Sequence, residues 1–206
     1  PMKDAYYSWS QGLSKPEALE RFFSYLHENV KSFGVVMSAD LFGMVTTNTD
    51  DLNIGQQLER ALPYFDYIAP MVYPSHYPPN FNGWKNPNAY PYELIKFVMG
   101  SAVERTIAST SAVQTMGATP IMKTVVVPAS ATTATTTKEV PSGRYTKTVW
   151  DKQKLRPWIQ DFSLGTPKYG PTEVRDQIRA TYDVGLTSWM LWSASNRYTK
   201  GALEPH

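Results

Sequence analysis

Short apolar runs alternate with amphipathic segments along this 206-residue chain, and that order is compatible with few folds. The clearest helix is predicted over residues 14–34, where Ser14 and Glu17 form a capping box ahead of apolar residues at helical spacing. Apolar runs rich in β-branched residues predict buried strands at 35–45, 66–74, 154–162 and 188–196. Further helices are expected at 54–65, at 93–107, and from Thr172 to Gly185. The alternation predicts an α/β fold with a parallel sheet of βα units.

The stretch PMVYPSHY, residues 70–77, ends the second predicted strand in an unusual way. Pro70 and Pro74 have no N–H to donate to a sheet ladder, so we expect them to cut the pairing short and to set the path of the backbone. Tyr73 and His76 would then be held at the end of the strand. Parallel-sheet proteins keep their active sites at this end, so the stretch is a candidate for function as well as fold.

Composition excludes several classes of function. With 42% hydrophobic residues, the chain can bury one core, and we expect residues 1–206 to form a single domain. A net charge of +2 without runs of like charge argues against nucleic acid as a partner, and no stretch reaches the ~20 apolar residues of a membrane span. The absence of cysteine excludes thiol chemistry, and three histidines argue against a zinc site, so no metal or cofactor is expected.

Two segments break the regular order. Residues 128–143 are rich in Thr and Ala and are interpreted as a flexible surface insertion without chemistry. Residues 78–92 form a long loop rich in Pro, Asn and Gly, in which Trp84 is expected to anchor the loop rather than to bind a ligand.

The order of elements fits either an open doubly wound sheet or a closed (β/α)8 TIM barrel. The doubly wound sheet normally carries a Gly-rich phosphate turn after a strand, and none is found. In the barrel, reactive groups come from the ends of several strands on one face. The residues Asp40, Tyr73, Asp161 and Trp192 each lie late in a predicted strand, which favours the barrel.

Four stretches in order resemble the C-terminal half of a family of bacterial TIM-barrel domains described as "putative glycosyl hydrolase": SADLFG, FDYIAPMVYPSHY, LRPWIQDF and GLTSWMLWSASNRY. The resemblance implies that the chain supplies about the last four βα units of a (β/α)8 barrel, as a half-barrel or fragment. A lone half would leave two open sheet edges and a bare interior. The missing N-terminal half would then come from the same polypeptide, from a second polypeptide or from a second copy of the chain.

Glycoside hydrolysis needs two carboxyl groups, one as acid and one as nucleophile or base, and Asp40 and Asp161 are the predicted catalytic pair. Alternatively, Asp40 caps a helix or pairs with an arginine. Alternation along the strand lets only one of Gln160 and Asp161 point inward unless the strand bulges. The family pattern also has an acid at the end of the fourth strand, which this chain does not contain, so the catalytic set would be incomplete here.

Tyr73, His76, Gln160 and Trp192 are the predicted substrate-binding residues. A phenol and an imidazole can meet a sugar hydroxyl or a developing charge, although His76 could equally bond a backbone carbonyl. Trp192 offers a flat ring on which the apolar side of a sugar can stack. Trp158 and Trp189 are expected in the core, and Arg156 in a surface ion pair.

The predicted function is a glycoside hydrolase that acts on a polysaccharide, with carbohydrate as the partner. A non-catalytic carbohydrate-binding barrel and a scaffold domain of the cell envelope are the alternatives, because fold does not dictate function. The resemblance also implies an extracellular or envelope-associated location.

Overall fold

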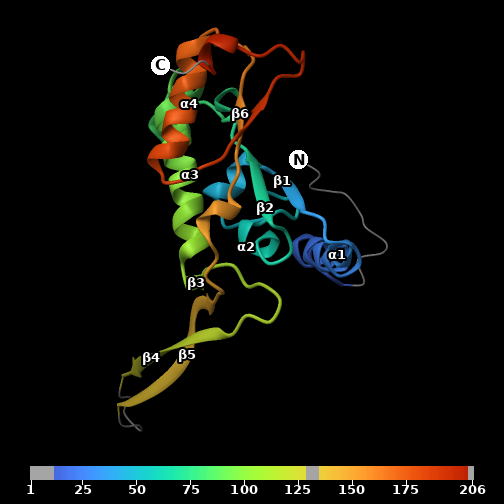
Figure 1. Ribbon diagram of the computed structural model, residues 1–206. Helices are drawn as coiled ribbons and strands as arrows, with labels where there is room; N and C mark the ends of the chain where they lie inside the picture. The colour runs from blue at the N-terminus through green and yellow to red at the C-terminus, as the bar shows by residue number, and fades with distance from the viewer. Residues whose placement is uncertain (1–11, 129–134, 204–206) are drawn as a thin grey trace.

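The computed structural model describes residues 12–128 and 135–203, which form a mixed α/β fold (Figure 1). Four strands pair in parallel in the order β1-β2-β6-β7. Their bounds are β1 Ser38–Phe42, β2 Tyr67–Met71, β6 Trp158–Gln160 and β7 Met190–Trp192. The predicted parallel α/β fold is confirmed, with strands shorter than the apolar runs that indicated them.

Four α-helices accompany the sheet: α1 Lys15–Val30, α2 Leu58–Ala61, α3 Pro91–Ile107 and α4 Pro171–Asp183. The predicted capping box of α1 is present, because the Glu17 carboxylate accepts the Ser14 N–H at 2.9 Å and the Ser14 hydroxyl accepts the Glu17 N–H. Helix α4 begins at Pro171, within one residue of the predicted start near Thr172, but Thr172 is not its cap. Its N-cap is Gly170, whose N–H donates to the Glu173 carboxylate at 2.9 Å.

One face of the parallel sheet is packed and the other is open. Leu41, Ile68 and Ile159, from three adjacent strands, are at most 1% exposed and belong to the same core as residues of α2, α3 and α4. Figure 1 shows α3 and α4 side by side on one flank of the sheet. On the opposite face, Phe42 and Trp192 are 37% and 43% exposed. Alternation therefore separates a helix-covered face from an opposite face on which the edge strands β1 and β7 expose large aromatic side chains.

Pro70 lies inside β2, and the pairing of β2 with β1 continues through it. The prediction that Pro70 cuts this pairing short was wrong. Residues Tyr67–Met71 pair with Ser38–Phe42 without interruption. On the other side, β2 meets β6 only at Met71, and an isolated bridge joins Ile68 to Leu155, before β6. On this side the Val72 N–H donates to the Trp158 carbonyl and the Ile68 carbonyl accepts from the Arg156 N–H, so the missing N–H of Pro70 interrupts this ladder alone.

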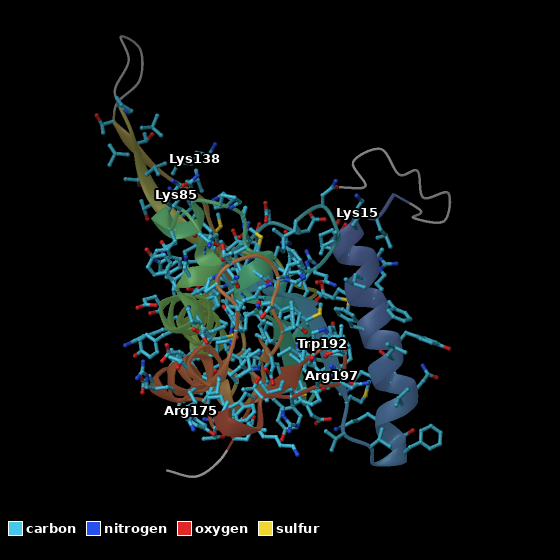
Figure 2. The ribbon with its side chains drawn as sticks, turned by 90° about the horizontal axis from the view of Figure 1, so that it is seen from above. Lys15, Lys85, Lys138, Arg175, Trp192 and Arg197 are labelled. Carbon is cyan, nitrogen blue, oxygen red and sulfur yellow. The ribbon has the colours of Figure 1, made fainter. Side chains whose placement is uncertain are left out.

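A second sheet forms an arm that projects from the rest of the molecule (Figure 1). It consists of β3 Thr110–Ser111, β4 Pro120–Val127 and β5 Thr136–Thr146, paired antiparallel in the order β3-β5-β4. Residues 136–143 of the predicted insertion are strand and exposed for the most part, rather than an irregular loop, and Lys138 marks them in Figure 2. Residues 129–134 lie outside the described residues. Because the arm follows α3, it leaves from the amino ends of the parallel strands, away from the loops where a barrel site forms.

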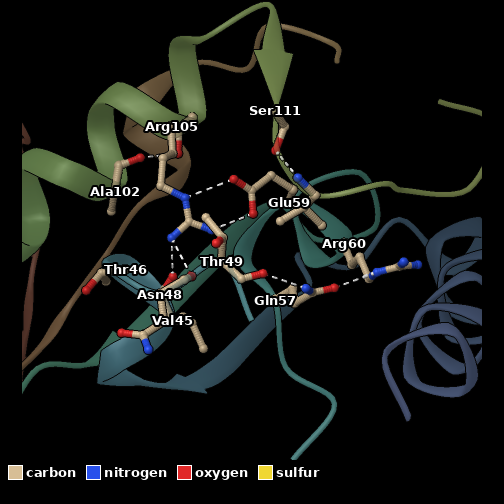
Figure 3. Close-up of polar contacts among 12 residues, drawn as sticks. Val45, Thr46, Asn48, Thr49, Gln57, Glu59, Arg60, Ala102, Arg105 and Ser111 are labelled. Atoms are coloured by element: carbon tan, nitrogen blue, oxygen red, sulfur yellow. Dashed lines mark hydrogen bonds and ion pairs between the residues drawn. The ribbon is translucent and has the colours of Figure 1, made fainter. Parts of the chain in front are cut away.

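Buried ion pairs connect the helices below the sheet (Figure 3). Arg105 of α3 donates two hydrogen bonds to the Glu59 carboxylate of α2, at 2.9 and 2.6 Å, and Glu59 is only 3% exposed. The remaining guanidinium nitrogen of Arg105 donates to the carbonyls of Val45 and Asn48. Arg60 donates one guanidinium N–H to the buried Glu20 carboxylate of α1 and its Nε–H to Gln57. These pairs set the position of the segment that follows β1.

We expect Gly43→Ala to destabilise the protein by about 1–3 kcal/mol, because the added methyl would collide with the backbone carbonyl oxygen of Met71. Backbone at the end of β2 cannot move aside without disturbing the sheet. The matched control is Gly100→Ala in α3, where the nearest atom is 3.8 Å away and the change should stabilise by about 0.5–1 kcal/mol. Urea unfolding measures both; equal free energies for the two variants would contradict this packing.

Glu59→Ala should cost about 3–5 kcal/mol, because it leaves the Arg105 guanidinium buried beside no carboxylate. The control is Asp176→Ala, which breaks the exposed pair with Arg179 and should cost at most about 1 kcal/mol. Thermal and urea unfolding of both variants measure the difference. A small loss for Glu59→Ala would show that the buried pair does not hold α2 to α3.

Candidate active site

The uncovered face of the parallel sheet carries one predicted catalytic residue, Asp40, together with two tryptophans. The indole N–H of Trp158 donates to Asp40 Oδ1 at 2.9 Å, across the intervening strand β2. Trp192 of β7 meets Trp158 edge to face, with ring centroids 6.0 Å apart. Asp40 is exposed and lies in the middle of β1, not near its end as predicted. The structure therefore brings Asp40 and Trp192 to the same face, with Trp158 between them.

Tyr73 and His76 follow β2 and join Phe162, which follows β6, in a triangle of rings. The centroids are 5.3 Å apart for Tyr73 and His76, 5.6 Å for Tyr73 and Phe162, and 5.9 Å for His76 and Phe162. We call these three residues the aromatic triangle. It lies where the carboxyl ends of adjacent parallel strands meet, as the sequence predicted for Tyr73 and His76.

The two titratable members of the aromatic triangle have opposite shifts with the same main cause. Burial, and to a smaller extent the negative charge of Asp40, raises the pKa of the Tyr73 phenol well above its usual value. Burial lowers the pKa of the His76 imidazole. At neutral pH the phenol is thus a hydrogen-bond donor and the imidazole is uncharged, with Nδ1 3.1 Å from the Ser75 hydroxyl.

The structure does not bring Asp161 to Asp40, contrary to the predicted catalytic pair. Both oxygens of the Asp161 carboxylate are occupied by Thr199, through its N–H at 2.7 Å and its hydroxyl at 2.6 Å. The residue is 4% exposed and follows Gln160, so it points away from the face of Trp158. Asp161 therefore binds the segment around Thr199 to the end of β6.

Gln160 does not reach the surface either, although it was predicted to bind substrate. It is 0% exposed, and its side-chain amide is used within the protein. Oε1 accepts from the Ser75 N–H at 3.0 Å, and Nε2 donates to the Phe162 carbonyl at 2.9 Å. A substrate could not contact this side chain without displacing the loops.

Trp158 and Phe162 belong to the site although the sequence analysis expected Trp158 in the core and passed over Phe162. Trp158 lies two residues before Gln160, and alternation would have placed both on one face of the strand. Nothing in the local sequence distinguishes Phe162 from a core residue. Trp84, in contrast, is the expected loop anchor: it stacks on Tyr90 and packs against Phe81 and Phe97.

Arg156 lies two residues before β6, beside Tyr67 at the start of β2. Its guanidinium is 5.5 Å from the ring centroid of Tyr67, and its Nε is buried without a hydrogen-bond partner in the structure. The surface ion pair expected for Arg156 is not among the salt bridges of the described residues. Within residues 12–128 and 135–203, no group of three or more His, Cys, Asp or Glu side chains could hold a metal ion.

A family model described as "Putative glycosyl hydrolase domain" matches residues 2–117 and 120–198. The chain belongs to this glycosyl hydrolase domain family. The membership agrees with the resemblance of its four strand-end motifs and establishes a glycoside hydrolase-like domain.

Comparison with solved structures shows a similarity to the PgaB (BpsB) glycoside hydrolase domain from Bordetella bronchiseptica, with 15% sequence identity and a TM-score of 0.45. The match covers 90% of this chain and 38% of the other, so the chain spans well under half the length of that relative. A search of curated proteins found no match. In the described part of the chain, no helix is both long and apolar enough to span a membrane.

The lowered pKa of His76 predicts a pH-dependent contribution to stability. The folded protein binds this proton less readily than the unfolded chain, in which the pKa is about 6.5. The contribution is therefore complete above pH 6.5 and is lost as the pH falls from there through the folded pKa. Against a His76→Gln control, the wild type should lose stability below about pH 6.5. Parallel curves of unfolding free energy against pH would contradict the partial desolvation of His76 by its neighbours.

Proposed function

We propose that the chain forms the catalytic face of a glycoside hydrolase that acts on a polysaccharide. The observation that carries this proposal is the Asp40 carboxylate, held by the Trp158 indole on an open, aromatic sheet face. One oxygen of Asp40 accepts from Trp158, and the other is available to a substrate or a water. Family membership supports the same chemistry.

The aromatic rings around Asp40 suit a sugar. Trp192 is 43% exposed and can stack under the apolar face of a pyranose. The protonated Tyr73 phenol and the His76 ring can donate to hydroxyl groups or to charge that develops at the leaving oxygen. A polysaccharide substrate also implies a site of action outside the cell or at its envelope.

Hydrolysis requires a second carboxyl group, which we assign to a residue outside this chain. Asp161 is occupied by Thr199 and cannot serve. With its partner about 5–5.5 Å away, Asp40 would act in a retaining mechanism, and at about 6.5–9.5 Å in an inverting one. The partner acid would occupy the strand next to β1, where the family pattern has one.

The completed form would be a (β/α)8 barrel, in which β1, β2, β6 and β7 supply the last four strands. Three observations support this. Among the described residues, no strand pairs with the outer edges of β1 and β7, and Phe42 and Trp192 are exposed on the face opposite the helices. Helix α1 leaves Phe22 and Tyr25 50% and 60% exposed, as expected where a preceding βα unit would pack. Among the described residues, Arg156 forms no salt bridge, and its Nε is buried without a hydrogen-bond partner. The remaining strands would come from the same polypeptide, a second polypeptide or a second copy.

The presence of a single available carboxylate on the described face favours a second candidate, a carbohydrate-binding barrel without catalysis. The two candidates share the aromatic face and differ in whether a partner acid stands within reach of Asp40. A scaffold role at the cell envelope has no such observation in its favour.

The decisive experiment changes Asp40 to Asn in the completed barrel and measures release of reducing ends from a panel of bacterial polysaccharides. If Asp40 is the acid or base, hydrolysis should fall by about 10²–10⁴-fold while glycan binding persists. Asp176→Asn, which alters an exposed carboxylate on α4, should leave the rate unchanged. An unchanged rate in Asp40→Asn would remove Asp40 from the mechanism. Binding without hydrolysis in the wild type would favour the second candidate.

A further inference from the structure

The aromatic triangle is built from two loops that are far apart in the sequence. Tyr73 and His76 lie on the loop after β2, and Phe162 lies on the loop after β6. Strand pairing constrains the separation of these loops only weakly, because β2 and β6 pair at Met71 and Trp158 alone, and the nearby isolated bridge joins Ile68 to Leu155, before β6. Some other contact must hold the loops together.

That contact is the side-chain amide of Gln160. Its Oε1 accepts from the Ser75 N–H at 3.0 Å, between Tyr73 and His76 in the chain. Its Nε2 donates to the carbonyl of Phe162 at 2.9 Å. The two polar ends of one planar group therefore bind the two loops that carry the triangle. We propose that Gln160 is a positioning residue, which sets the separation of the two loops and so the orientation of His76 and Phe162.

The backbone of Gln160 is also held in place by hydrogen bonds. Gln177 of α4 brackets its backbone, since the Gln177 amide accepts from the Gln160 N–H at 2.9 Å and donates to the Gln160 carbonyl at 2.8 Å. Both glutamines are 0% exposed. The Gln160 backbone is thereby fixed to a helix on the covered side of the sheet, while its side chain fixes the loops.

Asn88 extends the same connection to a third segment. Its Oδ1 lies 3.4 Å from Gln160 Nε2, and its own amide nitrogen donates to the carbonyls of Leu164 and Thr166 at 3.1 Å each. Asn88 is 4% exposed. The loop before α3 is thus joined to the loop after β6 around the Gln160 amide. Buried polar networks of this kind are rigid when every member is satisfied.

The polarity of the amide is essential to this role. A carboxylate of the same shape would still accept from the Ser75 N–H, but its second oxygen would face the Phe162 carbonyl, which is also an acceptor. Gln160→Glu therefore keeps the volume and breaks one side of the connection. Gln160→Leu breaks both sides.

The test follows the His76 imidazole by NMR titration of the full chain, with His76→Gln to assign its resonance. In wild type the His76 pKa should lie below the ordinary value of about 6.5. In Gln160→Glu and Gln160→Leu it should rise towards that value, because the released loop separates the imidazole from the Tyr73 and Phe162 rings that partly desolvate it. Thr106→Val, which removes one buried hydrogen bond within α3, should lower stability and leave the His76 titration unchanged. If both Gln160 variants fold and the His76 pKa is the same in them as in the wild type, the proposal is overturned.

A second measurement uses the wild type alone, in case the variants do not fold. The Ser75 amide hydrogen should exchange slowly with solvent, because it is bonded to Gln160. Fast exchange at Ser75, in a protein whose β2 amides are protected, would overturn the proposal. Neither measurement depends on glycoside hydrolysis. A failure of the proposed function would leave the His76 and Ser75 results unaffected, so the two failures can be told apart.

Discussion

Parallel pairing of β1, β2, β6 and β7 is the constraint on which the candidate site depends. Phe42, Met71 and Trp158 share a register row, and Asp40 lies two residues before Phe42 on the same face, so the side chains of Asp40 and Trp158 meet although 118 positions separate them in the chain. The helices cover one face and bury the apolar residues of each strand there. The polar and aromatic residues are left on the opposite face, where a carbohydrate can reach them.

The strand ends add a second layer to this arrangement. The loops after β2 and β6 carry rings that bury Tyr73 and partly desolvate His76, and this desolvation shifts their pKa values in opposite directions. A short ladder such as that between β2 and β6 could not align these loops alone. The buried amide of Gln160 adds the missing constraint, and family members that alter this side chain would be expected to arrange their loops differently.

Much of the fold could be predicted from the sequence because its signals are local. Capping residues, apolar periodicity and β-branched runs are enough to indicate α1 and all four parallel strands. The arm was missed for a physical reason: its Thr-rich composition suggested a flexible segment, whereas Thr also favours strands once a partner strand is present. The existence of such a partner is not a local property.

The site was harder to predict, since the direction of each side chain depends on distant contacts. Asp40 and Tyr73 were expected on one face, and the influence of the Asp40 charge on Tyr73 agrees with that expectation. Gln160 and Asp161 could not be distinguished by alternation alone. The hydrogen-bond partner of Asp161 is Thr199, 38 residues further on, and no sequence pattern around either residue predicts that contact. The covered and uncovered faces of β6 become known only with the position of α4.

The claim that the open face of the sheet receives carbohydrate can be tested by NMR of the tryptophan indole groups in the completed barrel. Soluble oligosaccharides of neutral, amino and acidic sugars would be added while the N–H resonances of all six tryptophans are followed. The account predicts that a bound sugar shifts Trp158 and Trp192 together and leaves Trp84 and Trp189 in place. A sugar that shifts Trp84 or Trp189 while Trp158 and Trp192 remain unchanged would contradict it.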